Sequence, residues 1–329
     1  MNALLEVRDL KVHFPIRGGW FSAPEMLKAV DGVSFDLVAG ETLGIVGESG
    51  CGKSTLGRAI LQLIPPTAGA IAWLGAPLSH DDNRAVRVAR SQMQVVFQDP
   101  LASLDPRMTA GDIIAEPLRN FARDLSTRER EARVAEMMSA VGLLPTMINR
   151  YPHEFSGGQC QRIGIARAMI LKPKLVICDE PVSALDVSVR AQVVNLLMEL
   201  QRAFGLSLIF ISHDLAVVRH ISHRVMVLYL GRVMELSTRD ALYATPRHPY
   251  TQALLAAVPV PDPEKERAKP RVILGGDPPS PLHPPSGCVF RTRCPHATSI
   301  CAEAVPPLES AGAGHEVACH HWRKIAGSL

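Results

Sequence analysis

The feature that most constrains this 329-residue sequence is a glycine-rich segment, GESGCGKST at residues 47–55. It follows a strand-like run and opens a helix-like one, which is the setting that the G-x-x-x-x-G-K-[ST] pattern requires. Glycines let the backbone curl so that successive N–H groups point at phosphate oxygens, and the positive end of the following helix adds to the attraction. A glycine-rich turn with an exposed lysine is the alternative interpretation, but the full pattern favours a nucleotide site.

We expect the whole segment to bind the nucleotide: Gly47, Glu48, Ser49, Gly50, Cys51, Gly52, Lys53, Ser54 and Thr55. The Lys53 ammonium would reach the β- and γ-phosphates, and the Ser54 hydroxyl would bind Mg²⁺.

A second segment, LVICDEP at residues 175–181, ends an apolar run in two carboxylates. Neighbouring residues at the end of a strand point in opposite directions, so Asp179 and Glu180 can have different tasks. Asp179 would hold Mg²⁺, and Glu180 would orient or deprotonate the attacking water. Such acids can also be solvated turn residues. The phosphate-binding pattern elsewhere in the sequence favours the functional interpretation.

Strand-like and helix-like segments alternate along most of the chain, which predicts an α/β domain with a largely parallel, buried sheet. The predicted strands are residues 4–14, 40–46, 93–97, 175–178 and 207–211, and the predicted helices include residues 54–64 and 190–204.

The remaining organisation follows from shifts in composition. Helical spacing dominates residues 100–168, where Ser126 and Glu129 form a possible capping box for a solvated helix over residues 126–141. Nine prolines fall between Val258 and Ser286. We therefore predict a first domain over residues 1–258, a proline-rich linker over 259–286 and a cysteine-rich C-terminal domain over 287–329.

Charge and hydropathy exclude several classes. The formal net charge is only +3, and no run of five like charges occurs, which argues against a nucleic-acid protein. The first residues lack the apolar core of a signal peptide, and no stretch of about 18 apolar residues could span a membrane. The chain is interpreted as cytosolic, so it would serve a membrane only by docking onto other chains.

Four of the seven cysteines, Cys288, Cys294, Cys301 and Cys319, lie close together near the C-terminus. In a reducing compartment they suggest a metal or cluster site rather than disulfides. Four thiolates suit either a [4Fe–4S] cluster or tetrahedral Zn²⁺, although structural zinc usually shows a tighter cysteine pair than is present here. Unligated cysteines in a small packed tail are the third alternative.

Residues 4–258 resemble the ABC ATPase family, and the decisive segment is FSGGQ at residues 155–159. It resembles the family's signature sequence, and the residues concerned are Ser156, Gly157, Gly158 and Gln159. The alternative is a purely structural role, in which the serine only caps a helix. The resemblance implies a head-to-tail dimer in which ATP lies between one subunit's phosphate loop and the other subunit's signature. The sequence departs from the family at Cys160, where Arg or Gln is more usual.

Further residues match the family. Gln98 resembles the glutamine of the loop that senses Mg²⁺ and water, and the segment Ser183-Ala-Leu-Asp186 resembles the loop that communicates across the dimer. His213 resembles the switch histidine at the γ-phosphate. Phe14 stands where the family offers an aromatic ring to adenine, although it could equally pack in the core.

The resemblance implies a P-loop NTPase fold. Its parts would be a mostly parallel core sheet, an antiparallel N-terminal β part, a helical signature subdomain and a small cysteine-rich appendage.

Within the family, residues 247–255 and the proline-rich run into Gly287-Cys288 resemble the ATPases of dipeptide and oligopeptide permeases, above all the second ATPase subunit of a dipeptide permease. That resemblance implies ATP-driven peptide import at the cytoplasmic face of a bacterial inner membrane, and it favours the [4Fe–4S] cluster. The implied partners are a second, related ATPase, two membrane-spanning permease subunits that dock near residues 101–117, and an extracytoplasmic substrate-binding protein. Nickel, glutathione or antimicrobial peptides are alternative cargoes. A soluble ABC ATPase acting on nucleic acid or ribosomes and a small-molecule kinase are weaker interpretations.

Overall fold

The computed structural model describes residues 3–16, 24–259, 262, 264, 267 and 275–325. The chain forms two compact units, each of which is built from several stretches of sequence. The first unit comprises residues 1–5, 37–42 and 73–212, and the second comprises residues 6–36, 43–72 and 213–329. Twelve of the 28 residues of the predicted linker, and residues 17–23, lie outside the described residues.

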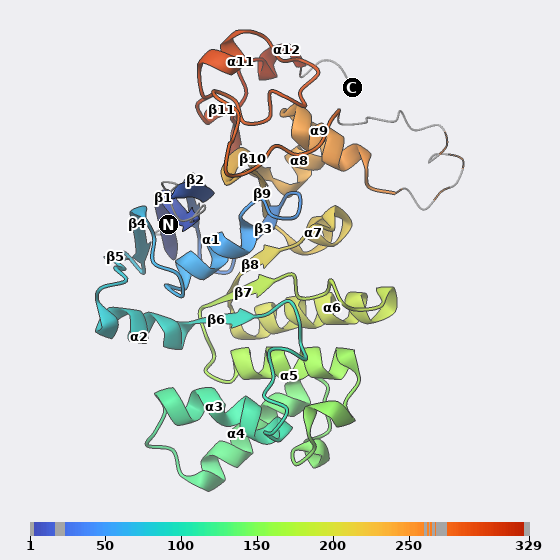
Figure 1. Ribbon diagram of the computed structural model, residues 1–329. Helices are drawn as coiled ribbons and strands as arrows, with labels where there is room; N and C mark the ends of the chain where they lie inside the picture. The colour runs from blue at the N-terminus through green and yellow to red at the C-terminus, as the bar shows by residue number, and fades with distance from the viewer. Residues whose placement is uncertain are drawn as a thin grey trace. The chain divides into compact units, whose positions relative to one another are not determined.

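The first unit contains three parallel strands in the order β8-β7-β6 (Figure 1). They are β6 (Met93–Val96), β7 (Leu175–Asp179) and β8 (Ser207–Ile211), and the unit also holds β5 (Ala76–Pro77), α2 (Asn83–Gln92) and α6 (Val187–Phe204). Every residue of β7 and β8 is buried, as expected for parallel strands covered on both faces. Burial raises the pKa of the Cys178 thiol to about 12, so this cysteine acts as a small apolar core residue.

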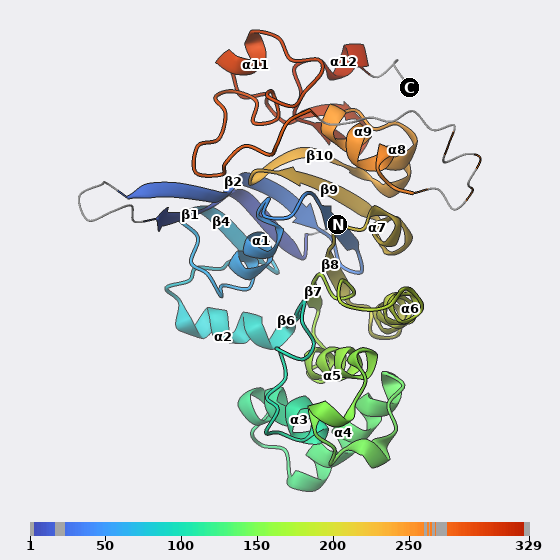
Figure 2. The same ribbon diagram turned by 45° about the vertical axis from the view of Figure 1, so that its right-hand side comes forward.

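The first unit also contains the predicted helical subdomain, whose helices lie together in Figure 2. It is formed by α3 (Ala110–Phe121), α4 (Thr127–Ala140), α5 (Gly157–Met169) and two short 3₁₀ turns, η1 (Pro145–Met147) and η2 (Pro152–Glu154). The predicted capping box is confirmed: the Ser126 hydroxyl accepts the Glu129 N–H, and the Glu129 carboxylate accepts the Ser126 N–H at 2.9 Å. Both donors would otherwise lack a partner within the helix.

The second unit combines a small sheet in the order β2-β1-β4 with a larger one in the order β11-β12-β10-β9-β3. The first sheet consists of β1 (Leu5–Ile16), β2 (Glu25–Leu37) and β4 (Ala68–Trp73). The second consists of β3 (Thr42–Val46), β9 (Arg224–Tyr229), β10 (Arg232–Thr238), β11 (Glu309–Gly312) and β12 (His315–Val317). The helices are α1 (Lys53–Ile60), α7 (Leu215–Ile221), α8 (Arg239–Ala244), α9 (Pro249–Ala256), α11 (Ile300–Glu303) and α12 (Trp322–Ile325). Strands β3 and β9 are parallel, whereas β10 pairs antiparallel with both β9 and β12.

The C-terminal segment, residues 287–325, is joined to the rest of the second unit through the β10–β12 pairing and through a buried carboxylate. Glu235 on β10 is fully buried. Its carboxylate accepts the Arg247 and His248 N–H groups at 2.7 and 3.0 Å and lies 2.6 Å from the His315 ring. A buried carboxylate needs several such partners to offset its lost hydration, so β10, α9 and β12 are held at one point.

The structure confirms most of the predicted elements, although the ends of several differ from the predicted ones by a few residues. The predicted strand over residues 207–211 coincides with β8. Helix α1 ends at Ile60 rather than at residue 64, because Gln62 adopts a left-handed backbone with φ 57°. A left-handed residue cannot be part of a right-handed α-helix, so the helical hydrogen bonds stop before Gln62.

His248 makes the stability of the protein depend on pH. Burial lowers its pKa from 6.5 to about 4, against the opposing effect of Glu235. Between pH 4 and pH 6.5, His248 is mostly protonated in the unfolded chain but mostly neutral in the folded protein. The stability contributed above pH 6.5 is therefore lost as the pH falls toward 4. From pH 7 to pH 5 the loss amounts to about 2 kcal/mol for this group.

We expect His248→Asn to flatten this pH dependence. The His248 ring accepts the Tyr250 N–H at the start of α9, and asparagine is a good helix cap that does not titrate. Urea unfolding midpoints at pH 7 and pH 5, compared between the two proteins, measure the effect. An equally steep fall in the variant would contradict the assignment.

Candidate functional site

Residues 47–55 form a loop that joins β3 to α1 in the second unit. Gly47, Gly50 and Gly52 have φ values of 155°, 78° and 103°. A Cβ atom on Gly47 would lie 2.2 Å from the Leu228 carbonyl oxygen, and one on Gly52 would lie 1.9 Å from that of Ala29. Gly47 and Gly52 therefore cannot be replaced without strain for two reasons: their φ values are positive, and a neighbouring carbonyl oxygen leaves no space for a Cβ atom.

Lys53 is buried and lies inside this loop. Its ammonium donates to the carbonyl oxygens of Gly47 and Glu48 at 2.8 and 2.9 Å. The first turn of α1 carries no acidic residue, and its N-cap, Gly52, offers no side-chain acceptor. A glycine-rich turn, a buried ammonium and the N-terminal end of α1 thus lie in one loop, and these are the groups that bind anions at a helix N-terminus. The predicted strand–loop–helix setting of residues 47–55 is present, and their role in phosphate binding stays a prediction.

The loop is fixed by partners from the rest of the second unit. The Cys51 carbonyl accepts the Gly231 N–H at 2.9 Å, and the Tyr250 hydroxyl accepts the Glu48 N–H at 2.9 Å. Arg293 of the C-terminal segment forms an ion pair with the Glu48 carboxylate. Sequence reasoning missed Tyr250 and Arg293 as parts of the site, although the Arg-His-Pro-Tyr segment that ends at Tyr250 stood out as a family feature.

The two predicted acids lie at the end of β7 in the first unit. Asp179 is its last residue and is buried. Glu180 has a left-handed backbone with φ 47°, and its N–H donates to the Ile211 carbonyl at 3.0 Å. The strand therefore ends at Asp179, and a turn begins at Glu180, whose carbonyl oxygen accepts the Ser183 N–H at 3.3 Å.

Gln98 and Glu180 are brought together although 82 positions separate them in sequence. The Gln98 Nε2 atom lies 3.3 Å from the Glu180 Oε2 atom, at the limit of a hydrogen bond. Because β6 and β7 are parallel neighbours, the segments that follow them emerge at the same edge of the sheet. An amide and a carboxylate at this edge could bind one water molecule or share a hard cation.

The signature segment begins α5, as predicted. Ser156 is the N-cap, its hydroxyl accepts the Gln159 N–H, and the Gln159 side-chain oxygen accepts the Ser156 N–H at 3.0 Å. A Cβ on Gly158 would lie 2.6 Å from Val189 Cγ1. Cys160 is fully buried, and its thiol donates to the Pro152 carbonyl at 3.4 Å. The departure from the family pattern therefore lies in the core, away from the exposed Ser156.

The remaining predicted residues are spread over both units. Asp186 is exposed at the N-cap of α6 in the first unit, and Val187 beside it has 81% of its surface exposed. In the second unit, His213 is exposed just before α7, whose N-cap is Asp214. Phe14 is half-buried in β1, so it is not a fully buried core residue.

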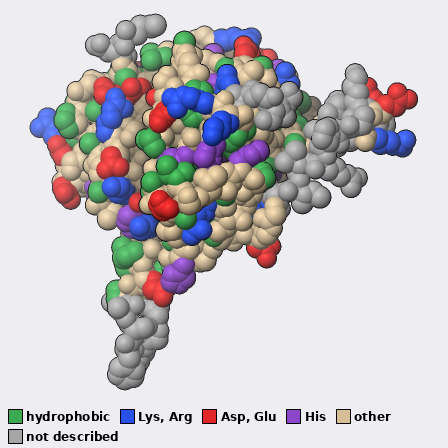
Figure 3. All heavy atoms as spheres, turned by 90° about the horizontal axis from the view of Figure 1, so that it is seen from above, with side chains coloured by type: hydrophobic (Ala, Val, Ile, Leu, Met, Phe, Trp, Pro, Cys, Tyr) green, Lys and Arg blue, Asp and Glu red, His purple; other side chains and the backbone are tan. Residues whose placement is uncertain are grey.

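The four clustered cysteines lie together in the C-terminal segment, with Cys288 and Cys301 buried and the other two partly exposed. The Cys288 N–H donates to the Cys301 carbonyl at 2.8 Å. Burial, with a smaller contribution from the other thiols, raises the pKa of Cys294 to about 11 and of Cys319 to about 12. Histidine side chains gather near the middle of the face seen in Figure 3. Within the described part of the chain, no group of three or more His, Cys, Asp or Glu side chains is placed to hold one metal ion.

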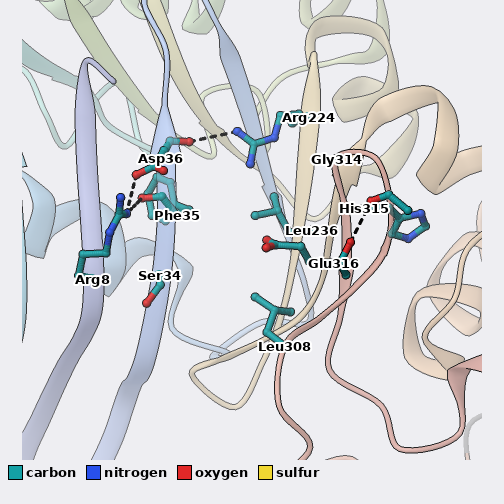
Figure 4. Close-up of a pocket in the computed structure, with 12 residues that line it drawn as sticks. Arg8, Ser34, Phe35, Asp36, Arg224, Leu236, Leu308, Gly314, His315 and Glu316 are labelled. Carbon is teal, nitrogen blue, oxygen red and sulfur yellow. Dashed lines mark hydrogen bonds and ion pairs between the residues drawn. The ribbon is translucent and has the colours of Figure 1, made fainter. Parts of the chain in front are cut away.

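A pocket of about 430 Å³ lies elsewhere in the second unit (Figure 4). Its cations are already engaged: Arg8 pairs with the Asp36 carboxylate, and Arg224 donates to the Asp36 carbonyl at 3.1 Å. None of the residues predicted to bind nucleotide or to react lines this pocket. Among the described helices, none is both long and apolar enough to cross a membrane.

Comparison with protein families gives two matches. The family described as "ABC transporter" matches residues 30–183, and the "Oligopeptide/dipeptide transporter, C-terminal region" matches residues 234–301. The second match includes Cys288, Cys294 and Cys301.

Curated relatives match along nearly the whole chain. The oligopeptide transport ATP-binding protein OppF of Escherichia coli (strain K12) is 62% identical, and the alignment covers 97% of this chain and 96% of that protein. OppF of Salmonella typhimurium (strain LT2) is 63% identical with the same coverage. Among solved structures, the dimeric post-hydrolysis state of the cassette MJ0796 bound to ADP and Pi has a TM-score of 0.64 and 28% identity. It covers 71% of this chain and 98% of that one.

Gly50 and Gly52 provide a matched test of the loop's geometry. Alanine at Gly50 meets only the left-handed backbone, because no atom lies within 4 Å of its Cβ, whereas alanine at Gly52 also meets the Ala29 carbonyl. We expect Gly50→Ala to cost about 1 kcal/mol of stability and Gly52→Ala about 2 kcal/mol more. Urea unfolding of both variants measures the difference, and equal costs would show that the loop does not pack on β2 as described.

Proposed function

The chain belongs to the ABC transporter family, and from this premise we propose that it is the ATP-hydrolysing subunit of an importer of oligopeptides. The observation that carries the proposal is the relationship to oligopeptide transport ATP-binding proteins over 97% of the chain, C-terminal region included. The loop over residues 47–55 supports it, because its glycines and Lys53 converge as phosphate binding requires. Dipeptides are a narrower cargo of the same class. Nickel, glutathione and antimicrobial peptides remain alternatives.

Backbone groups and side chains of this chain have separate tasks in the proposed hydrolysis of ATP. The N–H groups of residues 47–55 and the Lys53 ammonium bind the β- and γ-phosphates. Glu180 holds the attacking water and accepts its proton, while the neighbouring Gln98 amide orients that water. His213 donates to the γ-phosphate and stabilises the charge that develops there.

A magnesium ion fits the oxygen-rich side chains that the sequence singled out. Ser54, Gln98 and Asp179 offer a hydroxyl, an amide carbonyl and a carboxylate, all of which are hard oxygen donors. When bound, the ion neutralises charge on the phosphate oxygens. The contact between Gln98 and Glu180 supports this assignment, because it places one proposed ligand beside the proposed base.

Dimerisation with a second, related ATPase would complete the site. We propose that Ser156, Gly157, Gly158 and Gln159 bind the nucleotide held by the partner, and that Asp186 contacts that partner. Ser156 and Asp186 are both exposed at helix N-termini, where the helix dipole favours an anion or a polar partner. The large exposed fraction of Val187 supports an interface at this place.

Transport requires further partners. We propose that residues 101–117 contact two membrane-spanning permease subunits at the cytoplasmic face of the inner membrane, with an extracytoplasmic binding protein delivering the peptide. Leu101 leaves 56% of its surface exposed directly after the Gln98 segment, which supports a docking role. The half-buried Phe14 ring is proposed to stack on adenine.

We also propose that Cys288, Cys294, Cys301 and Cys319 bind a [4Fe–4S] cluster in a C-terminal domain over residues 287–329, beyond a linker over residues 259–286. The four thiols are near enough to influence one another's pKa. A four-iron cluster is larger than a single ion, so its ligands lie farther apart than those of one zinc.

The cluster can be tested by metal analysis. Protein purified without oxygen should carry near-stoichiometric iron and acid-labile sulfide, and Cys294→Ser should reduce both. Cys160→Ser, which alters a buried cysteine in α5, is the matched control and should retain them. Zinc alone, or no metal, would contradict the cluster.

Glu180→Gln tests the transport function. We expect ATP hydrolysis by the assembled transporter to fall at least about 100-fold, because general-base catalysis is lost, and uptake of a labelled oligopeptide to cease. Glu199→Gln, an equivalent change at an exposed position of α6, should leave both unchanged.

Expression and membrane association of the two variants must match. Oligopeptide uptake that persists with Glu180→Gln would contradict the cargo, and nickel and glutathione would be tested next. Undiminished hydrolysis would contradict the role of Glu180 itself.

A further inference from the structure

One side chain of the C-terminal segment reaches the phosphate loop. The Arg293 Nη1 atom lies 3.0 and 2.8 Å from the two carboxylate oxygens of Glu48, the second residue of the loop. The exposed fractions of the two side chains are 8% and 28%. The pair is thus largely withdrawn from water, where opposite charges attract more strongly than on an open surface.

The same segment also supports the Glu48 backbone. Phe290 packs on Tyr229 and Tyr250, with ring centroids 5.4 and 5.3 Å apart. Tyr250 is fully buried, and its hydroxyl accepts the Glu48 N–H. Glu48 is therefore held twice by groups that depend on the C-terminal segment, once at its carboxylate and once at its amide.

This arrangement is costly in free energy. Arg293 loses hydration on burial, and its Nε atom is buried without a hydrogen-bond partner in the structure. An exposed arginine on an exposed glutamate would avoid both costs. Stability alone therefore gives little reason to bury this pair, because buried ion pairs are seldom more stabilising than well-packed apolar residues.

The position of Glu48 suggests what the pair does. Its carbonyl oxygen accepts a hydrogen bond from Lys53, so Glu48 lies beside the lysine of the loop that is proposed to bind the phosphates. A free carboxylate there would repel a triphosphate. Arg293 neutralises the Glu48 carboxylate, and its own guanidinium carbon lies 6.0 Å from the centroid of the Tyr229 ring, which favours a cation there.

We propose that Arg293 is a positioning residue for the phosphate loop, through which the C-terminal segment sets the affinity of the protein for ATP. The inference rests on the proposed role of residues 47–55. Arg293 directly precedes Cys294, so any group bound by the four cysteines is held one residue from this contact.

The test uses the full-length chain assembled in its transporter, with ATP as the titrated ligand. Arg293→Met keeps the apolar stem of the side chain and removes the charge. We expect the KM for ATP to rise about tenfold with kcat within about twofold, because the loop binds ATP less well while Glu180 is untouched. A merely structural defect would lower the amount of active protein, and therefore kcat, without changing KM.

Two further variants separate the electrostatic role from other effects. Glu48→Gln combined with Arg293→Met removes both charges, and we expect a KM below that of Arg293→Met alone. Arg291→Ala is the matched control: this arginine lies in the same segment and donates hydrogen bonds to the carbonyl and hydroxyl oxygens of Ser286, so the KM of this variant for ATP should be unchanged.

An unchanged KM in Arg293→Met, or a double variant worse than the single one, would overturn the proposal. If thermal unfolding shows that Arg293→Met is not folded, Arg293→Lys replaces it, with an expected rise in KM of about threefold and an unchanged KM as the contrary result. Lys53→Ala tests the premise separately, since ATP binding that survives this change would show that residues 47–55 are not the phosphate site.

Discussion

The fixed backbone of the phosphate loop is the constraint on which the rest of this structure depends. An anion can be bound by N–H groups only if those groups already converge, since ordering a free loop would consume the binding free energy. Here Gly47 and Gly52 approach the Leu228 and Ala29 carbonyls more closely than any side chain would permit. The loop is thus shaped by β9 and β2, which frame it within the second unit.

The C-terminal region extends this framework. Buried Glu235 joins β10 to the start of α9 and to His315 of β12. Helix α9 in turn carries Tyr250, whose hydroxyl accepts the Glu48 N–H. A chain of hydrogen bonds and aromatic contacts therefore runs from β12 to the loop over residues 47–55. Removing the C-terminal segment would expose Glu235 and Tyr250 together, so this segment is part of the architecture that supports the site.

Much of the fold could be predicted from the sequence because its signals are local. The strands β7 and β8 are buried on both faces, and a short continuous apolar run is typical of such a strand. Ser126 and Glu129 indicate the start of a helix, because their spacing allows the hydrogen bonds of a capping box. The end of α1 was missed because Gln62 carries no strong sequence signal for its left-handed backbone. The pairing of β12 with β10 could not be inferred either, since β12 is only three residues long and its partner is distant in sequence.

The sequence by itself determined the chemical groups of the candidate site: glycines that permit the loop, one lysine, two adjacent acids and a helix-capping serine. Each of these depends on residue type and short spacing, which the chain carries wherever it folds. Only the tertiary structure decided which distant groups meet them. Arg293 lies 245 positions from Glu48, and Gln98 lies 82 from Glu180. Such contacts depend on how strands pair and helices pack over the whole unit, because the entropy of closing long loops is repaid only by the collective burial of the core.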